Sequence, residues 1–353
     1  MDSSEALATA STSTSSTYEM TVAKVQGRLS MPEEAESKPH YVLKRGSVVK
    51  FRNPYPSYSN SNGPRSIFRN VVWPVITGEL KQPDTTSHSL PVTEPQWLPS
   101  RTSSDKLRAT WLGHACYYVE FPSGLRVLFD PVFEDRCSPF SFLGPKRYTR
   151  QPCAVHDMPV VDAVVISHSH YDHLSRTSVL EIQRKHPDVH FFVGLGLEKW
   201  FRGCGLRNVT ELDWWEDVDL TIAPKTADDQ ATSTATPSPG PDAAEKRRRG
   251  GGGARKKSAI GALRGPFDLG LIPIGAYHPR AAFSAVHAGP GDAVDMMRDT
   301  RCRRALAMHW ATWALTLEDV DEPPRLLREA LRRRGLPEEG VFDVCEIGAS
   351  REF

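Results

Sequence analysis

The chain has 353 residues, of which 39% are hydrophobic and 25% charged, and its formal net charge is +1. These values are ordinary for a globular protein with a core, and the balanced charge argues against electrostatic steering to nucleic acid. No apolar run approaches the roughly 18 residues that span a bilayer, the N-terminus lacks a signal-peptide pattern, and the cysteines form no C-x-x-C pair. We therefore expect an intracellular, cytoplasmic protein with reduced thiols.

The first hundred residues carry few signals of regular structure. Residues 1–45 are rich in Ser, Thr and acidic side chains, which predicts a disordered N-terminal tail. Residues 46–105 are rich in Pro, Asn, Trp and Ser. That composition predicts an extended segment, with short turns, packed on the domain that follows.

Residues 106–220 have the pattern of the first half of an α/β domain. The run Val160–Ile166 is largely apolar and of strand length, so it is expected to be buried on both faces. Ser175 is a plausible N-cap for the helix that follows. The predicted strands are 108–114, 116–121, 125–131, 160–166, 190–193 and 209–212, and the predicted helices are 176–185 and 197–202.

Residues 221–264 interrupt this pattern, and residues 265–350 resume it. The interruption has few apolar residues, a Pro/Ser/Thr tract, four consecutive glycines and two basic clusters, which predicts a disordered low-complexity insert. The second half has predicted strands at 269–274, 303–309 and 341–347, and predicted helices at 292–299 and 324–334. Two runs of strands, each followed by helices, indicate two sheets back to back with helices outside.

The stretch "ISHSHYDHLS", Ile166–Ser175, places three histidines and an aspartate directly after the buried strand. In an H-x-H-x-D-H loop, two imidazoles can point at one metal ion while the next carboxylate and imidazole face a second. This ligand mixture suits zinc, with iron or manganese as alternatives. Two ions roughly 3.5–4 Å apart can acidify a shared water and stabilise a displacement at phosphorus or carbon. The alternative is a His-rich surface loop that binds no metal.

This motif resembles the signature of the metallo-β-lactamase fold, an αββα sandwich in the α/β class. Other segments resemble the N-acylphosphatidylethanolamine-hydrolysing phospholipase D family, and the resemblance runs from about residue 51 to 350 except for the insert. The segments that carry it are "TWLGHACYYVEF", "LFDPVFEDRCSPFSFLGPKRYTRQPC", "ELDWWED", "GPFDLGLIPIGAYHPR" and "AMHWATWAL".

The resemblance implies a two-zinc centre and a ligand set. His168 and His170 match ligands of the first zinc, while Asp172, His173 and His309 match ligands of the second. Among these, Asp172 is also expected to be catalytic.

Two further histidines match family positions outside this ligand set. His287 resembles a histidine near the substrate phosphate and is expected to be catalytic, with a helix-entry histidine of no role as the alternative. His114 would lie beside the site and support a ligand, with a satisfied structural histidine as the alternative.

Two ligands that the resemblance implies are missing. The family pattern has a further histidine after a strand and an aspartate in a Gly-Asp-Thr-Gly setting, but between Trp215 and Gly265 there is no histidine and no such aspartate. Zinc occupancy is therefore doubtful in this chain. Two explanations are open: a degenerate homologue with a weak or inactive centre, or a gene model that retains translated non-coding sequence. Intact motifs on both sides favour the second.

The resemblance implies a zinc-dependent phosphodiesterase that hydrolyses N-acylphosphatidylethanolamine to an N-acylethanolamine and phosphatidic acid. The alternatives are another hydrolase of the same fold, such as a lactonase or a different phosphodiesterase, and a non-catalytic lipid-binding homologue. The expected partners are a membrane phospholipid substrate and, peripherally, the membrane surface. Nucleic acid is not expected, and a homodimer is an open alternative to a monomer.

Overall fold

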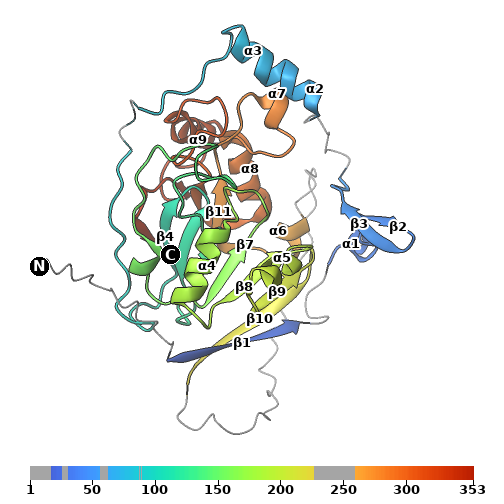
Figure 1. Cartoon of the computed structure of the whole chain (residues 1–353). Helices are drawn as coiled ribbons and strands as arrows, with labels where there is room; N and C mark the ends of the chain where they lie inside the picture. The colour runs from blue at the N-terminus through green and yellow to red at the C-terminus, as the bar shows by residue number, and fades with distance from the viewer. Residues whose placement is uncertain (1–16, 26–30, 56–62, 87, 89, 226–258) are drawn as a thin grey trace, which may run out of the picture.

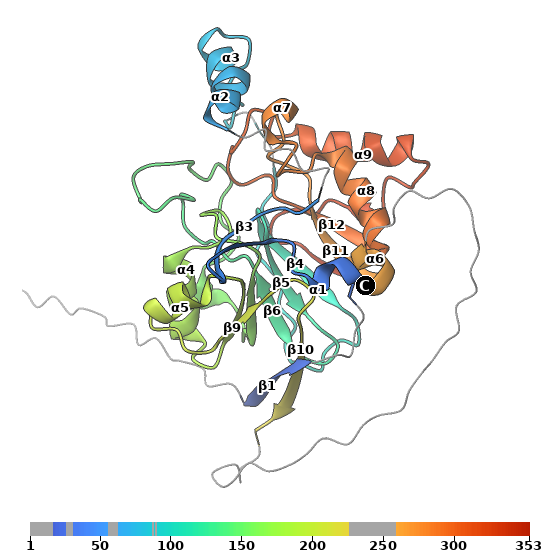
Figure 2. The same ribbon diagram turned by 90° about the vertical axis from the view of Figure 1, so that its right-hand side faces the viewer.

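Two β-sheets pack face to face between layers of helices (Figure 2). The structure is a computed structural model that describes residues 17–25, 31–55, 63–86, 88, 90–225 and 259–353. Helices α4 and α5 lie on one side of the strands, and α8 and α9 lie on the other, so the chain has the predicted αββα arrangement. The predicted fold class is therefore confirmed.

The large sheet has seven strands in the order β14-β4-β5-β6-β7-β8-β9 (Figure 1). Pairing is antiparallel from β14 to β6 and parallel from β6 to β9. Parallel strands buried on both faces carry near-continuous apolar runs, as the sequence of β7 does. The bounds are β4 (Arg108–Gly113), β5 (Cys116–Glu120), β6 (Arg126–Phe129), β7 (Ala163–Ile166), β8 (His190–Gly194), β9 (Val209–Leu212) and β14 (Ser350–Glu352).

The small sheet has three parallel strands in the order β11-β12-β13. Helices α8 and α9 cover it, with Val294, Met297, Leu327 and Leu331 buried in the core shared by the two sheets. The bounds are β11 (Phe267–Pro273), β12 (Cys302–Met308), β13 (Phe342–Asp343), α6 (Ala259–Leu263), α7 (Arg280–Phe283), α8 (Pro290–Thr300) and α9 (Glu322–Arg333).

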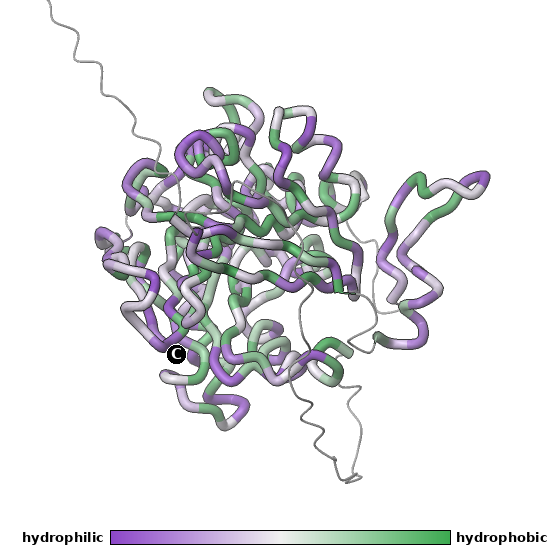
Figure 3. The backbone as a smooth tube through the Cα atoms, turned by 90° about the horizontal axis from the view of Figure 1, so that it is seen from below, coloured by the Kyte–Doolittle hydropathy of each residue, from purple (hydrophilic) through white to green (hydrophobic). Residues whose placement is uncertain are grey.

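Helices α4 and α5 cover the outer face of the large sheet, and the start of α4 is set by a side-chain cap. Helix α4 (Arg176–Lys185) starts after Ser175, whose side chain accepts from the main-chain N–H of Ser178 as an N-cap. Its Val179 and Ile182 are fully buried against the sheet. The other elements here are η2 (Val155–Asp157) and α5 (Glu198–Gly203). Seen from below, the hydrophobic stretches concentrate toward the middle of the molecule (Figure 3).

Part of the stretch predicted as a disordered tail, residues 1–45, is instead a strand. β1 (Tyr18–Val25) pairs antiparallel with β10 (Asp217–Pro224), and both lie along the bottom of the molecule (Figure 1). The alternating side chains Met20 and Val22 of β1 pack on the large sheet, and this tertiary contact outweighs the polar composition around them. Residues 1–16 and 26–30 lie outside the described residues.

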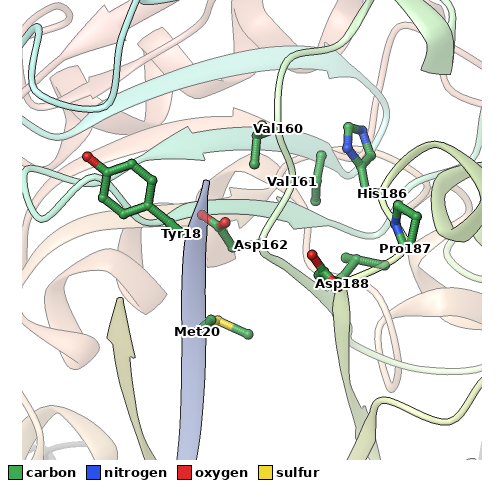
Figure 4. Close-up of a pocket in the computed structure, with 9 residues that line it drawn as sticks. Tyr18, Met20, Val160, Val161, Asp162, His186, Pro187 and Asp188 are labelled. Carbon is green, nitrogen blue, oxygen red and sulfur yellow. The ribbon is translucent and has the colours of Figure 1, made fainter. Parts of the chain in front are cut away.

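Arg101 and Asp162 secure β1 against the large sheet. The Arg101 guanidinium donates to both carboxylate oxygens of Asp162 at 2.7 Å and lies over the Tyr18 ring, 4.7 Å from its centroid. Figure 4 shows Tyr18, Met20 and Asp162 around a cavity of about 20 Å³ that His186 also lines.

Other expected boundaries also shift. The segment expected to be extended, residues 46–105, contains a strand and a continuous helical stretch, and the region near residue 40 forms a hairpin. Of the predicted insert, residues 226–258 lie outside the described residues, while 221–224 belong to β10 and 259–263 to α6. The elements between β1 and residue 77 are α1 (Glu33–Glu36), β2 (Tyr41–Lys44), β3 (Ser47–Phe51), α2 (Pro64–Ile67), the π-helical η1 (Phe68–Val72) and α3 (Trp73–Ile76).

Candidate metal centre

The loop between β7 and α4 carries four of the predicted site residues. It leaves the carboxyl end of the buried strand β7 and turns sharply, because the main-chain N–H groups of His173 and Leu174 both donate to the carbonyl of His170. The turn directs Asp172 and His173 inward, where His173 is 3% exposed, while His168 and His170 remain exposed. One short loop therefore divides its ligand-type side chains between the interior and the surface.

His309 comes to the same place from the other sheet. It directly follows β12, and its Nε2 lies 3.0 Å from His173 Nε2 and 3.4 Å from Asp172 Oδ2. The third side of this triangle, His173 Nε2 to Asp172 Oδ2, is 3.2 Å. Ligands about 2.0–2.1 Å from a tetrahedral ion are separated by roughly 3.3–3.4 Å, so the triangle has the size of one face of such a site.

His114 adds a fourth donor. Its Nε2 lies 2.9 Å from Asp172 Oδ2, and one ligand atom from each of His114, Asp172, His173 and His309 lies within 4.8 Å of all the others. His114 is 2% exposed. The resemblance had suggested a position beside the site, and the structure places the side chain in the donor cluster itself.

Asp130 is a member of this site that the sequence analysis did not single out. It follows β6, is 5% exposed, and its Oδ2 lies 2.8 Å from His173 Nδ1. The same carboxylate accepts from the main-chain N–H and the hydroxyl of Ser167. A carboxylate on the far ring nitrogen fixes the tautomer and orientation of a ligand histidine. A signal was present, because the Asp in "LFDP" ends an apolar strand next to the strand that precedes the histidines.

Three residues at this junction have left-handed backbone conformations. The φ angles are 48° at His114, 42° at Asp130 and 66° at His309. Non-glycine residues rarely adopt such angles, and they persist where surrounding contacts over-determine them. The backbone therefore turns out of three separate strands at the point where the donor side chains meet.

His168 and His170 form a separate, exposed pair. His168 Nε2 lies 3.0 Å from His170 Nδ1, and the ring centroids of His168 and His173 are 4.1 Å apart. Within the described ranges only one group of three or more metal-type donors forms, and it does not include this pair. The structure thus brings these two histidines next to the cluster, and no further ligand from the described part of the chain joins them.

His287 lies on the other side of the cluster, on the segment that follows α7. It is half-buried, and its ring centroid is 5.5 Å from that of His309. Burial, followed by the neighbouring charge of His309, lowers the pKa of His287 to about 4. The structure places it beside the cluster, and no contact assigns it a role.

The electrostatics of the four-donor cluster favour a bound cation. Burial opposes ionisation of Asp172, but hydrogen bonds with His114, His173 and His309 hold its pKa far below the usual range. Burial also lowers the pKa of His173, yet bonds to Asp130 and Asp172 outweigh it and raise that pKa to about 9. Burial, with the charge of His309, keeps the pKa of His114 well below its ordinary value.

Two imidazole Nε2 atoms at 3.0 Å cannot both point lone pairs at each other without a proton or a metal ion between them. The donors His114, Asp172, His173 and His309 therefore fit a metal ion.

Comparisons with known proteins place this arrangement in context. The model of the β-lactamase superfamily domain matches residues 125–310. An N-acyl-phosphatidylethanolamine-hydrolyzing phospholipase D 1 of Caenorhabditis elegans is 34% identical over 274 residues, covering 70% of this chain and 76% of that protein. A mitochondrial protein of Saccharomyces cerevisiae with the same activity in its name is 30% identical, covering 69% of this chain and 55% of its own length.

Other similar proteins have names that state a broader activity or none. An uncharacterised protein of Mycobacterium tuberculosis is 31% identical, covering 75% of this chain and 74% of its own. Among solved structures, a metallo hydrolase of Ignicoccus hospitalis is 18% identical with a TM-score of 0.42, covering 70% of this chain and 98% of that one.

Proposed function

Because this chain belongs to the metallo-β-lactamase-fold family of N-acylphosphatidylethanolamine-hydrolysing phospholipases D, and is a metal-dependent hydrolase of that fold, we propose that it is a phosphodiesterase acting on N-acylphosphatidylethanolamine. The products would be an N-acylethanolamine and phosphatidic acid. The observation that carries the proposal is the four-donor cluster, and relatives of at least 30% identity carry this activity in their names.

Zinc is the proposed metal. Imidazole and carboxylate donors together suit it, and the edges of 3.0–3.4 Å between Asp172, His173 and His309 match its bond lengths. When bound, such an ion polarises a phosphoryl oxygen and acidifies water.

The remaining chemistry belongs to the chain. Asp172, His173 and His309 would hold the cation, and Asp130 holds His173 in the tautomer that leaves Nε2 free. His287 lies beside His309, and in this proposal it would donate a ring N–H to a phosphate oxygen and so orient the diester. Walls formed by Trp313 and other buried side chains exclude bulk water from His114 and strengthen these interactions.

The proposed substrate is a membrane lipid, and one face of the chain suits contact with a membrane. The stretch 64–76 is continuously helical, and its exposed residues are 65, 68, 69, 72, 73 and 76, which form a single stripe at helical spacing. The stripe is apolar where helices of globular proteins are usually polar: exposed fractions are 53% at Phe68, 38% at Val72, 52% at Trp73 and 67% at Ile76.

Charge favours a lipid surface as the occupant of this stripe. Its two other members are Arg65 and Arg69, and the helix contains no acidic residue. Acylation of the ethanolamine nitrogen removes its positive charge, so the proposed substrate is anionic. Arginines flanking an apolar stripe can place their stems on the apolar layer and their guanidinium groups at the phosphates.

This face is linked to the metal centre through α7. The helix projects from the top of the molecule and lies against α7, which leads directly to His287 (Figures 1 and 2). A second exposed apolar loop is connected to the centre through other residues. In this loop, Phe140, Phe142 and Leu143 are 52%, 78% and 60% exposed. Cys137 at its base packs on Trp313, whose ring centroid lies 5.1 Å from that of His114.

The function is tested by incubating zinc-loaded protein with N-acylphosphatidylethanolamine in mixed vesicles and measuring both products by mass spectrometry. We expect turnover that chelation abolishes and zinc restores, with His173→Ala lowering it by at least about 1,000-fold, as loss of a group essential to the reaction typically does. His156→Ala, at an exposed histidine remote from the centre, is the matched control. Zinc-loaded protein that leaves this lipid intact but opens a lactone would favour the other hydrolase class.

A further inference from the structure

We propose that this chain binds a single metal ion through His114, Asp172, His173 and His309, in place of the two-ion centre that the family resemblance implies. The inference deepens the proposed function, because it names the metal site on which that function rests. It assigns His114 as a ligand and leaves His168 and His170 without an ion of their own.

The position of His114 supports a ligand role. Its Nε2 approaches Asp172 Oδ2, the same oxygen that lies nearest to His173 and His309, so all four donors converge on one volume. Its main chain is held at both ends: the N–H donates to Thr312 Oγ1 at 2.7 Å, and the carbonyl accepts from His309 N–H at 2.8 Å. Because the buried side chain is already fixed in this way, little conformational entropy is lost when an ion binds.

The ligand count also favours one ion. His173 and His309 with Asp172 supply three donors, and His114 supplies a fourth. A zinc ion that expands to five-coordinate can hold these four and still take water or substrate. His168 and His170, which the resemblance assigns to the first zinc, supply only two imidazoles, and both residues are exposed. Two exposed imidazoles compete poorly with water for zinc.

Among the residues that the structure describes between β9 and β11, none joins His168 and His170 as a third donor. The sequence from 216 to 264 contains no histidine. Of the aspartates that precede the undescribed residues 226–258, Asp213 is bonded by His40, Lys38 and Tyr41, and Asp217 is paired with Arg264 at 2.9 Å. These carboxylates are already engaged, so neither is available to bridge two ions.

The first measurement is the metal content of the full chain, purified without chelator, loaded with Zn²⁺ and desalted. Native mass spectrometry and elemental analysis should both give one zinc per chain. Two zinc ions per chain would overturn the proposal. Because no lipid is present, this result is independent of the proposed reaction: a chain with one zinc and no lipase activity would contradict the function alone.

The ligand assignment is tested on the unmodified chain with Co²⁺ in place of zinc. Each coordinated histidine contributes one strongly shifted, exchangeable ring N–H signal in the proton NMR spectrum. We expect three such signals, for His114, His173 and His309. Two signals would overturn the assignment of His114.

Variants give a second, independent reading. His114→Ala should lower zinc affinity by more than about 100-fold, whereas loss of a hydrogen bond to a ligand costs roughly 10–100-fold. His114→Gln separates the two roles, because a glutamine amide can still donate to Asp172 but coordinates zinc poorly. Affinity restored by His114→Gln would contradict ligation. His168→Ala is the matched control at the exposed pair and should retain one zinc at unchanged affinity.

Discussion

The main-chain N–H of His309 donates to the main-chain carbonyl of His114 at 2.8 Å. His114 follows β4 of the large sheet, and His309 follows β12 of the small sheet, so this bond joins the two halves of the sandwich at the donor cluster. The ring centroids of the two histidines lie 4.1 Å apart. The geometry of the centre therefore depends on how the sheets pack, and a change that shifts one sheet should also disturb the donors.

Asp130→Asn tests the orientation of His173. The amide nitrogen or oxygen of asparagine cannot reproduce all the bonds that this carboxylate makes to His173 and Ser167, so the ring should lose its fixed tautomer. We expect zinc affinity to fall roughly 10–100-fold, measured by competition with a chromogenic chelator. Asp135→Asn, at a carboxylate whose side chain is 64% exposed, should bind zinc normally. Equal affinities for the two variants would argue against a positioning role for Asp130.

Gly275→Ala tests the contact between β11 and the turn that carries His309. A Cβ at Gly275 would lie 2.3 Å from the His309 carbonyl oxygen and 2.9 Å from Trp310 Cβ, so the turn must move. We expect a loss of about 1–3 kcal/mol in the free energy of unfolding, together with weaker zinc binding.

The matched control for this change is Gly203→Ala. A Cβ at Gly203, the last residue of α5, meets nothing within 4 Å. Chemical denaturation of both variants gives the comparison. If Gly275→Ala were as stable as Gly203→Ala and bound zinc as tightly, the turn would be more tolerant than the packing indicates.

Phe68→Ser with Trp73→Ser tests the exposed apolar stripe. Together the two changes remove large side chains that are 53% and 52% exposed, so the folded core should be unaffected. We expect the wild-type chain to sediment with vesicles that contain anionic phospholipid, less so at high salt because the arginine contribution is screened. The double variant should remain in the supernatant.

Val49→Ser is the control for the vesicle experiment. Val49 is 57% exposed on β3, away from the stripe (Figure 1). The Val49→Ser variant should sediment with the vesicles as the wild type does. Sedimentation of the double variant at the wild-type level would show that the stripe does not contact lipid.

His186 should make the stability of the fold depend on pH. It is 4% exposed, and burial, followed by the charge of Lys185, lowers its pKa to about 4. An unfolded histidine titrates near 6.5, so above that pH both states are neutral and the full stability is present. Between about 6.5 and 4 only the unfolded chain takes up the proton, and stability falls by at most about 3 kcal/mol.

The measurement is the free energy of unfolding at pH 7.5 and pH 5. The wild-type chain should lose more stability on acidification than His186→Gln, which cannot titrate there. His156→Gln, with a side chain that is 77% exposed, should follow the wild type. A His186→Gln profile parallel to the wild type would show that His186 takes up its proton at the same pH in the folded and the unfolded chain.

Local patterns were enough to predict most elements of the sandwich. β4 to β9 and α4 lie within a few residues of the predicted bounds, because apolar periodicity, Ser175 as a cap and Gly203 at a helix end are local signals. The predictions failed where a distant partner decides. β1 is ordered by pairing with β10, some two hundred residues later, and β14 leaves the second half to pair with β4.

The same division applies to the candidate centre. The sequence by itself determined which side chains can bind a metal and that four of them share one loop after a buried strand, because residue type and spacing are local properties. Only the tertiary structure decided which of them meet. It brings His114 and Asp130 from separate strands into contact with Asp172 and His173, since strands far apart in the chain end at one edge of the sandwich. It also leaves His168 and His170 at the surface, because the loop that carries them turns His173 inward.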